Sequence, residues 1–279
     1  MTFGNTGSKL LAMTIFPSLP LAGWRHTRNS IQTYANIMGS VHEAIVPPGK
    51  QGWQSGLQAA AAGLTTTPMP AKGFVFELML DFVAHQLRIY TSKGSHRAVA
   101  LQGQSAELFC TQLVDGLAVL GIAPDIDHMA FADETPGMYD ETAVSAMWQA
   151  FTQIDVVFKQ FQRSLRGATS PVQLWPQPFV LGLTWQTGRQ VPGQAAEEQM
   201  TFGFSTGDAI VDNPYFYATA NPTPRTFTER PLPDPAYWQT DKFTGAILLY
   251  EDVQTAVDPA AKLLEFLQAT HEAGRKTMT

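Results

Sequence analysis

The sequence predicts an α+β protein in which antiparallel sheets pack against helices. Apolar residues recur at spacings of three and four over 141–166, and they alternate with polar residues over 74–82. The first period is that of one helix face, and the second is that of a strand with one buried side. The 22 glycines and 19 prolines supply frequent turns between such elements.

The first half of the chain predicts a helix followed by a meander of strands. Segment 28–45 carries apolar residues at the same alternating spacing as 141–166, so we expect a first amphipathic helix there. Strand 74–82 is followed by two shorter segments, 85–91 and 97–101, each separated by a short turn. Short turns between successive strands are typical of antiparallel pairing.

Helix boundaries are predicted from caps. Ser105 and Gly121 bracket a helix over 105–120, and Asp140 precedes the helix over 141–166. The last helix, 259–273, has Asp258 before it, Pro259 at its first position and Gly274 after it. Within 141–166, Lys159 follows Asp155 by four residues, which predicts an ion pair along the helix.

The second half repeats the order of the first. A Gln-x-Trp sequence follows the first helix at Gln51 and Trp53, and another follows helix 141–166 at Gln173 and Trp175. Strand 74–82 then corresponds to about 197–205, and segment 221–244 is an insertion. We treat 1–279 as one globular unit, with a pseudo-repeat of halves 16–123 and 140–274 as the alternative to an unrepeated α+β domain.

Composition excludes several classes of protein. The net charge is −6, only 15% of residues are charged, and 11% are aromatic. Disordered chains lack such aromatic content, and nucleic-acid binding requires clusters of Lys and Arg that are missing here. The uncharged stretches contain Gly, Pro, Gln and Thr, so we expect no membrane span. A single cysteine, Cys110, fits a cytoplasmic protein without disulfides.

Several motifs resemble an uncharacterised bacterial domain-of-unknown-function family. They include Leu19-Pro20-Leu21-x-x-Trp24, Gly63-Leu64-Thr65-Thr66-x-Pro68, Asp81-Phe82-x-x-His85, Phe158-Lys159-x-Phe161 and Ser170-Pro171. The resemblance covers about residues 16 to 273. It implies a shared fold, and it implies no reaction because the family has no established activity.

The same resemblance indicates where this chain departs from the family. Other members carry His where this chain has Gln32, Gln51 and Gln173, and a His-Glu pair where it has Glu197-Glu198. An imidazole changes its charge near neutral pH and binds metals, whereas an amide only donates and accepts hydrogen bonds. We therefore predict no metal site and no cofactor.

The candidate ligand-binding residues are amides, aromatic rings, hydroxyls and one carboxylate. They are Gln32, Gln51, Trp53, Thr65, Thr66, Gln173, Trp175 and Glu198. Rings supply apolar area and amides orient a polar ligand, which is typical of small-molecule pockets. The simpler interpretation is that the Trp residues are core and the Gln residues cap strands. The carboxylates nearest predicted core elements are Glu43, Glu77, Asp81, Asp155 and Glu198.

Three functions are compatible with this sequence. The first is binding of a polar small organic molecule in a cleft between two similar halves. The second is a non-catalytic scaffold protein that self-associates, with Phe227, Tyr237 and Trp238 of segment 221–244 as contacts. The third is an enzyme with Glu198 as general base. Ligand, reaction and oligomeric state stay open at this stage.

Overall fold

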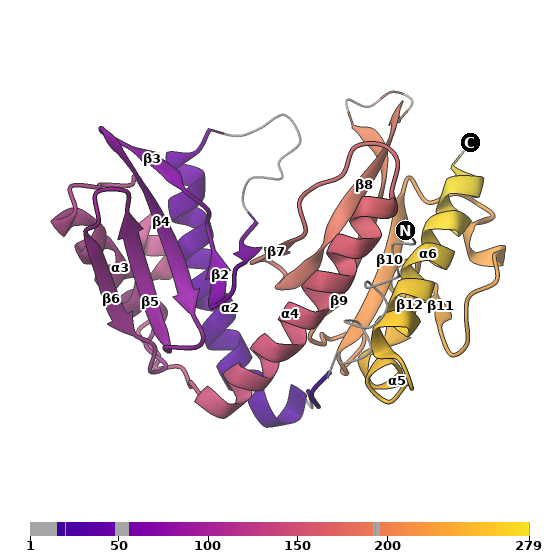
Figure 1. Ribbon diagram of the computed structural model, residues 1–279, viewed down its shortest axis with the longest axis horizontal. Coiled ribbons are helices and arrows are strands. Elements are labelled where there is room, and N and C mark those ends of the chain that lie inside the picture. Colours follow the sequence, from indigo (N-terminus) through magenta and orange to yellow (C-terminus); the bar gives the residue numbers. More distant parts are fainter. Residues whose placement is uncertain (1–15, 20, 48–55, 192, 194–195, 279) are drawn as a thin grey trace, which may run out of the picture. The chain divides into compact units, whose positions relative to one another are not determined.

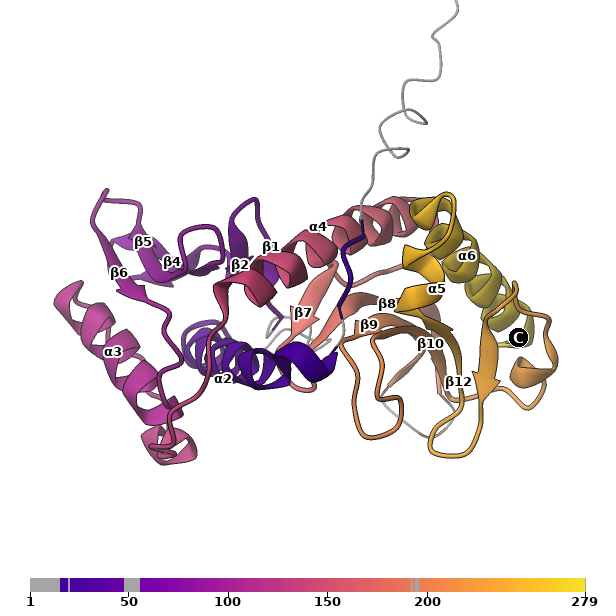
Figure 2. The same cartoon turned by 90° about the horizontal axis from the view of Figure 1, so that it is seen from below.

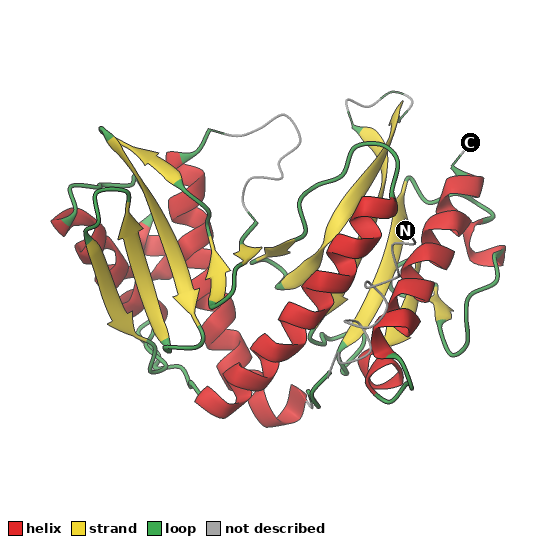
Figure 3. Cartoon of the chain, in the orientation of Figure 1, coloured by secondary structure: helices red, strands yellow, loops and turns green. Residues whose placement is uncertain are grey.

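The computed structural model describes residues 16–19, 21–47, 56–191, 193 and 196–278. Gln51 and Trp53 of the predicted ligand set lie outside these residues. Within the described part, the chain forms five α-helices and two antiparallel sheets, which confirms the predicted α+β class (Figure 3).

The chain divides into two compact units, which we call the N-unit and the C-unit. The N-unit comprises Ala22–Trp148 and Gln173–Phe179. The C-unit comprises Gln149–Val172, Val180–Thr279 and the chain up to Leu21. Segment 173–179 therefore belongs to the N-unit, although the residues on both sides of it belong to the C-unit.

The N-unit contains a sheet with strand order β1-β2-β4-β5-β6, in which β3 also pairs with β4 (Figure 1). Its strands are β1 (Gln58–Ala59), β2 (Gly63–Thr65), β3 (Met69–Ala71), β4 (Phe74–Asp81), β5 (Gln86–Thr91) and β6 (His96–Ala100). The predicted strand 74–82 and its meander are thus present, with ends shifted by one residue. Successive side chains of β4 point to opposite faces of the sheet, so Leu78 and Leu80 are buried, whereas Glu77 is partly exposed.

Helices α2 (Leu21–Ile45) and α3 (Ala106–Val119) bury the apolar face of the N-unit. Tyr34 of α2 stacks on Phe109 of α3 with ring centroids 4.1 Å apart. On α3, Gly116 leaves room for the Ile89 side chain of β5. The α2 helix begins seven residues earlier than predicted, at Leu21, because Trp24 and Thr27 extend its buried stripe by two turns.

The C-unit contains a sheet with strand order β11-β12-β10-β9-β8. Its strands are β8 (Val180–Gln190), β9 (Glu197–Ser205), β10 (Tyr215–Asn221), β11 (Tyr237–Gln239) and β12 (Gly245–Leu249). The predicted strand 197–205 is confirmed residue for residue. Segment 221–244, predicted as an insertion, contributes β11, which pairs with β12 at the sheet edge.

Aromatic side chains form the core between this sheet and the helices of the C-unit. These helices are α4 (Glu141–Ser164, whose residues from Gln149 on belong to the C-unit), α5 (Tyr250–Gln254) and α6 (Pro259–Thr277). Along α4, Phe151, Phe158 and Phe161 contact rings of β9 and β10 edge to face. Such aromatic pairs contribute about 0.5–1.5 kcal/mol each beyond their buried area. Figure 2 shows these three helices on the same side of the C-unit sheet.

Of two predictions about the helices of the C-unit, one is confirmed and one is wrong. Asp155 and Lys159 form the predicted ion pair, with 2.7 Å between Oδ2 and Nζ. Gly274 was predicted to end the last helix, but α6 continues to Thr277. The glycine serves packing instead, since a Cβ at Gly274 would lie 2.1 Å from Sδ of Met200 on β9.

Two glycines mark equivalent strands in the two units. In Gly63-Leu64-Thr65 of β2 and Gly182-Leu183-Thr184 of β8, the glycine lies directly against the neighbouring strand. A Cβ would lie 1.7 Å from the carbonyl oxygen of Leu80 at Gly63, and 2.1 Å from that of Phe202 at Gly182. The antiparallel orders β2-β4-β5-β6 and β8-β9-β10-β12 also match. These likenesses support the proposal of two similar halves.

One of the six histidines, His271 on α6, lies among aromatic rings. Its ring is 4.7 Å from that of Trp185 and also contacts Phe161 and Phe202. Its buried Nε2 has no hydrogen-bond partner among the described residues. Burial, with Arg275 nearby, lowers the pKa of His271 below its usual value, so the neutral imidazole is favoured.

None of the helices in the described ranges is both long enough and apolar enough to cross a membrane.

We expect Gly63→Ala and Gly182→Ala each to lower the free energy of unfolding by about 1–3 kcal/mol, because the added methyl group meets backbone atoms that cannot yield. Gly23→Ala on α2 is the control, since nothing lies within 4 Å of its Cβ position. Urea unfolding followed by circular dichroism gives the three values. Unchanged midpoints for both strand variants would contradict the packing described.

We expect His271 to make stability depend on pH. Because its pKa is lower in the folded than in the unfolded state, its contribution is complete above about pH 6.5 and is lost as the pH falls below that value, by at most about 1.4 kcal/mol per pH unit. His271→Phe keeps the ring contacts and should flatten the pH dependence. Urea midpoints between pH 5 and 8 test this, and parallel curves for both proteins would refute it.

Candidate functional site

A polar stripe runs along α2 on the side opposite its apolar stripe. The side chains of Arg28, Gln32, Asn36, Ser40 and Glu43 recur at three- and four-residue spacing, which places them on one helix face. Arg28 Nη1 lies 3.5 Å from Gln32 Oε1, so the stripe is partly connected along the helix.

Segment 173–179 lies beside this stripe. Leu174, in β7 (Gln173–Trp175), exchanges two backbone hydrogen bonds with Leu57, of 2.7 and 2.8 Å. The chain then turns back, and the amide of Phe179 donates to the carbonyl of Trp175 at 2.9 Å. This turn carries Trp175, Pro176 and Gln177 to the surface of α2.

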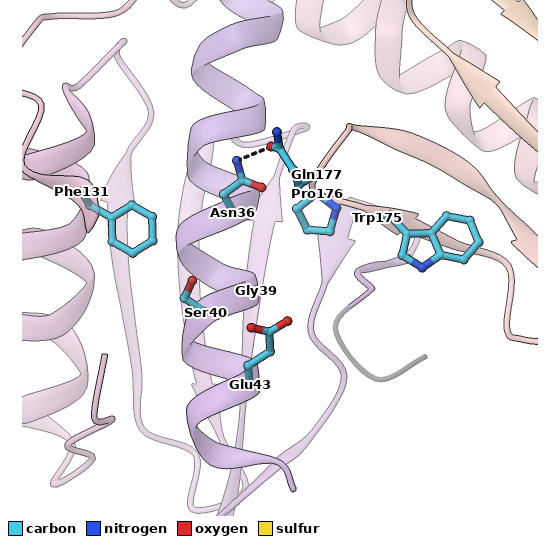
Figure 4. A pocket seen from close by; sticks show the side chains of 8 residues that line it. All are labelled: Asn36, Gly39, Ser40, Glu43, Phe131, Trp175, Pro176 and Gln177. Carbon is cyan, nitrogen blue, oxygen red and sulfur yellow. Dashed lines mark hydrogen bonds between the residues drawn. The ribbon is translucent and has the colours of Figure 1, made fainter. Parts of the chain in front are cut away.

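The Gln177 side chain accepts hydrogen bonds from two residues of the stripe. Its Oε1 accepts a hydrogen bond from Nδ2 of Asn36 at 3.2 Å and another from Nε2 of Gln32 at 3.3 Å. The Gln32 amide also lies 3.4 Å from the carbonyl oxygen of Pro176. Figure 4 shows Asn36 and Gln177 facing each other across the gap between the helix and the turn. The two elements are therefore held together by side-chain amides.

A pocket of about 350 Å³ opens beside this amide network. Its lining comprises Asn36, Gly39, Ser40, Glu43, Phe131, Trp175, Pro176 and Gln177 (Figure 4). Every one of these residues belongs to the N-unit. The volume lies at the lower end of the roughly 300–1,000 Å³ of small-molecule sites. Gly39, lacking a side chain, leaves one turn of α2 open at the pocket wall.

Two of the predicted ligand residues are at this pocket. Trp175 lines the pocket. Gln32 does so indirectly, by donating a hydrogen bond to Gln177, which is part of the lining. Thr65 and Thr66 instead bond within the sheet: Thr65 Oγ1 donates to Glu77 at 2.6 Å, and Thr66 Oγ1 accepts from the amide of Leu78 at 3.1 Å.

Gln173 is buried inside the N-unit and does not line the pocket. It is only 1% exposed and lies so close to Gly56 that a Cβ there would be 2.2 Å from Cδ of Gln173. Packing of the Gln173 side chain against Gly56 helps to fix the position of β7. Gln173 thus lies at the start of β7, where the simpler interpretation has it, and it is buried.

Glu198 lies in the C-unit. Its Oε2 accepts from Nε and Nη2 of Arg189, both at 2.8 Å, and from Oγ1 of Thr187 at 3.2 Å. Hydrogen bonds between a guanidinium and a carboxylate are stronger than those between neutral groups. This geometry favours a structural ion pair at the start of β9.

The predicted contacts for self-association lie mostly inside the C-unit. Phe227 is fully buried and its ring packs edge to face on Trp238, with centroids 4.6 Å apart. Trp238 Nε1 donates to the carbonyl of Arg230 at 2.9 Å. Tyr237 alone of the three is well exposed.

Sequence reasoning missed Asn36, Ser40, Phe131 and Gln177 as site residues. The signal available was the polar stripe of α2, because hydrophilic positions at four-residue spacing beside a buried stripe define a second helix face. Glu43 was singled out as a carboxylate near the core. Phe131 and Gln177 carry no such signal, since Phe131 ends a short 3₁₀ helix (His128–Phe131) and Gln177 lies in a turn.

In the part of the chain that the structure describes, no three His, Cys, Asp or Glu side chains are grouped so that they could hold a metal ion. His42, next to Glu43 on α2, is buried. Burial lowers its pKa and Glu43 partly opposes this, so the neutral imidazole is favoured beside the pocket.

We expect Gln177→Leu to free the side-chain amides of Gln32 and Asn36, because both donate to the oxygen that this substitution removes. In ¹⁵N-labelled protein, their NH₂ resonances should move and should exchange faster with water. Gln149→Leu, at an exposed position on α4, is the matched control. Unchanged Gln32 and Asn36 resonances in Gln177→Leu would refute the network.

Comparisons with known proteins identify the family. No curated protein and no solved structure gives a significant match to the chain. A family model described as a family of unknown function, DUF5996, matches residues 16–279. The match covers nearly the whole chain and both units, which confirms the resemblance drawn from the motifs. The chain belongs to the DUF5996 family.

Proposed function

We propose that this protein binds a polar small organic molecule in the pocket beside α2. The observation that carries the proposal is the shared acceptor at Gln177, which holds the turn 175–177 against α2 and so keeps the pocket open before any ligand arrives. Preorganised polar groups in a concave site supply orientation at low entropic cost.

The lining combines the two kinds of surface that such ligands need. Phe131, Pro176 and Trp175 supply apolar area, and Asn36, Ser40 and Glu43 supply hydrogen-bonding groups. The proposal places the site within the N-unit alone and retains Gln32 and Trp175 from the set predicted from sequence.

A thermal-shift screen of polar metabolites, followed by NMR titration of the hits, tests this function. A specific ligand raises the apparent melting temperature by mass action and perturbs the backbone amides of Asn36, Ser40 and Gln177. Ser40→Leu fills the pocket and should abolish both effects. Ser145→Leu, on the exposed side of α4 within the N-unit, is the control and should leave both unchanged. Hits that bind Ser40→Leu as well as wild type would refute the proposal.

A further inference from the structure

Two acceptors of the pocket lining receive no hydrogen bond from any described residue. Nδ2 of Asn36 is used in donating to Gln177, so its side-chain oxygen remains available. The Glu43 carboxylate, two helical turns further on, makes no hydrogen bond or ion pair with any described residue. A ligand that brings donors can bond to both acceptors.

The charge of the lining has one sign. Glu43 is the charged residue among those that line the pocket. An adjoining hollow shares Ser40, Glu43 and Phe131 with it and adds Asp125 and Asp127. Among the residues that the structure describes, neither lining contains Lys, Arg or His. An anionic ligand would meet carboxylates without a compensating cation, so it is disfavoured.

Two aromatic side chains share the pocket with the carboxylate. Phe131 and Trp175 belong to the same lining as Glu43 (Figure 4). The face of an aromatic ring attracts cations, by about 0.5–2 kcal/mol depending on how far the site is desolvated. Carboxylate and rings thus favour the same class of ligand.

We propose that the ligand of this pocket is an organic ammonium ion, whose N–H groups bond to the Asn36 oxygen and the Glu43 carboxylate while its carbon chain contacts Phe131 and Trp175. This inference rests on the proposed function, because it specifies the ligand of the same pocket.

Three ligands with the same four-carbon chain separate the effect of ligand charge from that of ligand shape. Butane-1,4-diammonium, butane-1,4-diol and butanedioate share a chain length and differ in end group. We expect the diammonium to perturb the amides of Ser40, Glu43 and Gln177 in NMR titrations at pH 7, with a Kd at least tenfold lower than that of the diol. Butanedioate should leave these amides unchanged.

Paired variants test the carboxylate. Glu43→Gln should weaken diammonium binding at least tenfold, whereas Glu107→Gln, the same charge change on the exposed side of α3, should not. Equal affinities for diammonium and diol, or a Glu43→Gln affinity equal to wild type, would overturn the ammonium assignment. So would the absence of pocket shifts with all three compounds. Neutral metabolites that still bind in the broader screen, and that Ser40→Leu excludes, would leave the proposed function in place.

Discussion

The backbone pairing of Leu57 with Leu174 is the contact on which the pocket depends. The residues flanking segment 173–179 belong to the C-unit, so the segment is held in the N-unit by what it touches there. Its two backbone hydrogen bonds are supported by complete burial of both leucine side chains and by Gln173 against Gly56. Each hydrogen bond contributes only about 0.5–1.5 kcal/mol net to stability, so burial of apolar surface supplies much of the free energy that keeps the segment in place.

Several polar side chains on the two sheets are already bonded to one another, unlike the Asn36 oxygen and the Glu43 carboxylate of the pocket. Thr65 is bonded to Glu77, Glu198 to Arg189, and Asp81 to Arg88. Each of these groups satisfies its partner within one sheet, which stabilises the fold and leaves little for a ligand. The Asn36 oxygen and the Glu43 carboxylate remain free because α2 leaves them on its polar side. This difference distinguishes a candidate binding site from structural polar pairs.

The amide at position 32 bears on the departure from the family pattern that the motif resemblance implies. Gln32 accepts from Arg28 through Oε1 and donates to Gln177 and Pro176 through Nε2. An amide keeps both roles at any pH, whereas an imidazole would change its donor and acceptor pattern near neutrality. The same amide therefore supports a fixed hydrogen-bond network and provides no acid–base chemistry. This is consistent with binding as the function of this member.

The sequence by itself determined the elements. Periodicity placed α4 and β4 to within two residues, because burial of one face imposes a spacing that is visible in the chain. The repeated order of the two halves placed β9. The sequence also named Trp175 and Gln32 as candidate ligand residues. Only the tertiary structure decided that Gly274 is a packing position, that His271 lies among aromatic rings, and that Phe131 and Gln177 meet at one pocket. These features join residues far apart in the chain, and no local period records which distant side chains will become neighbours.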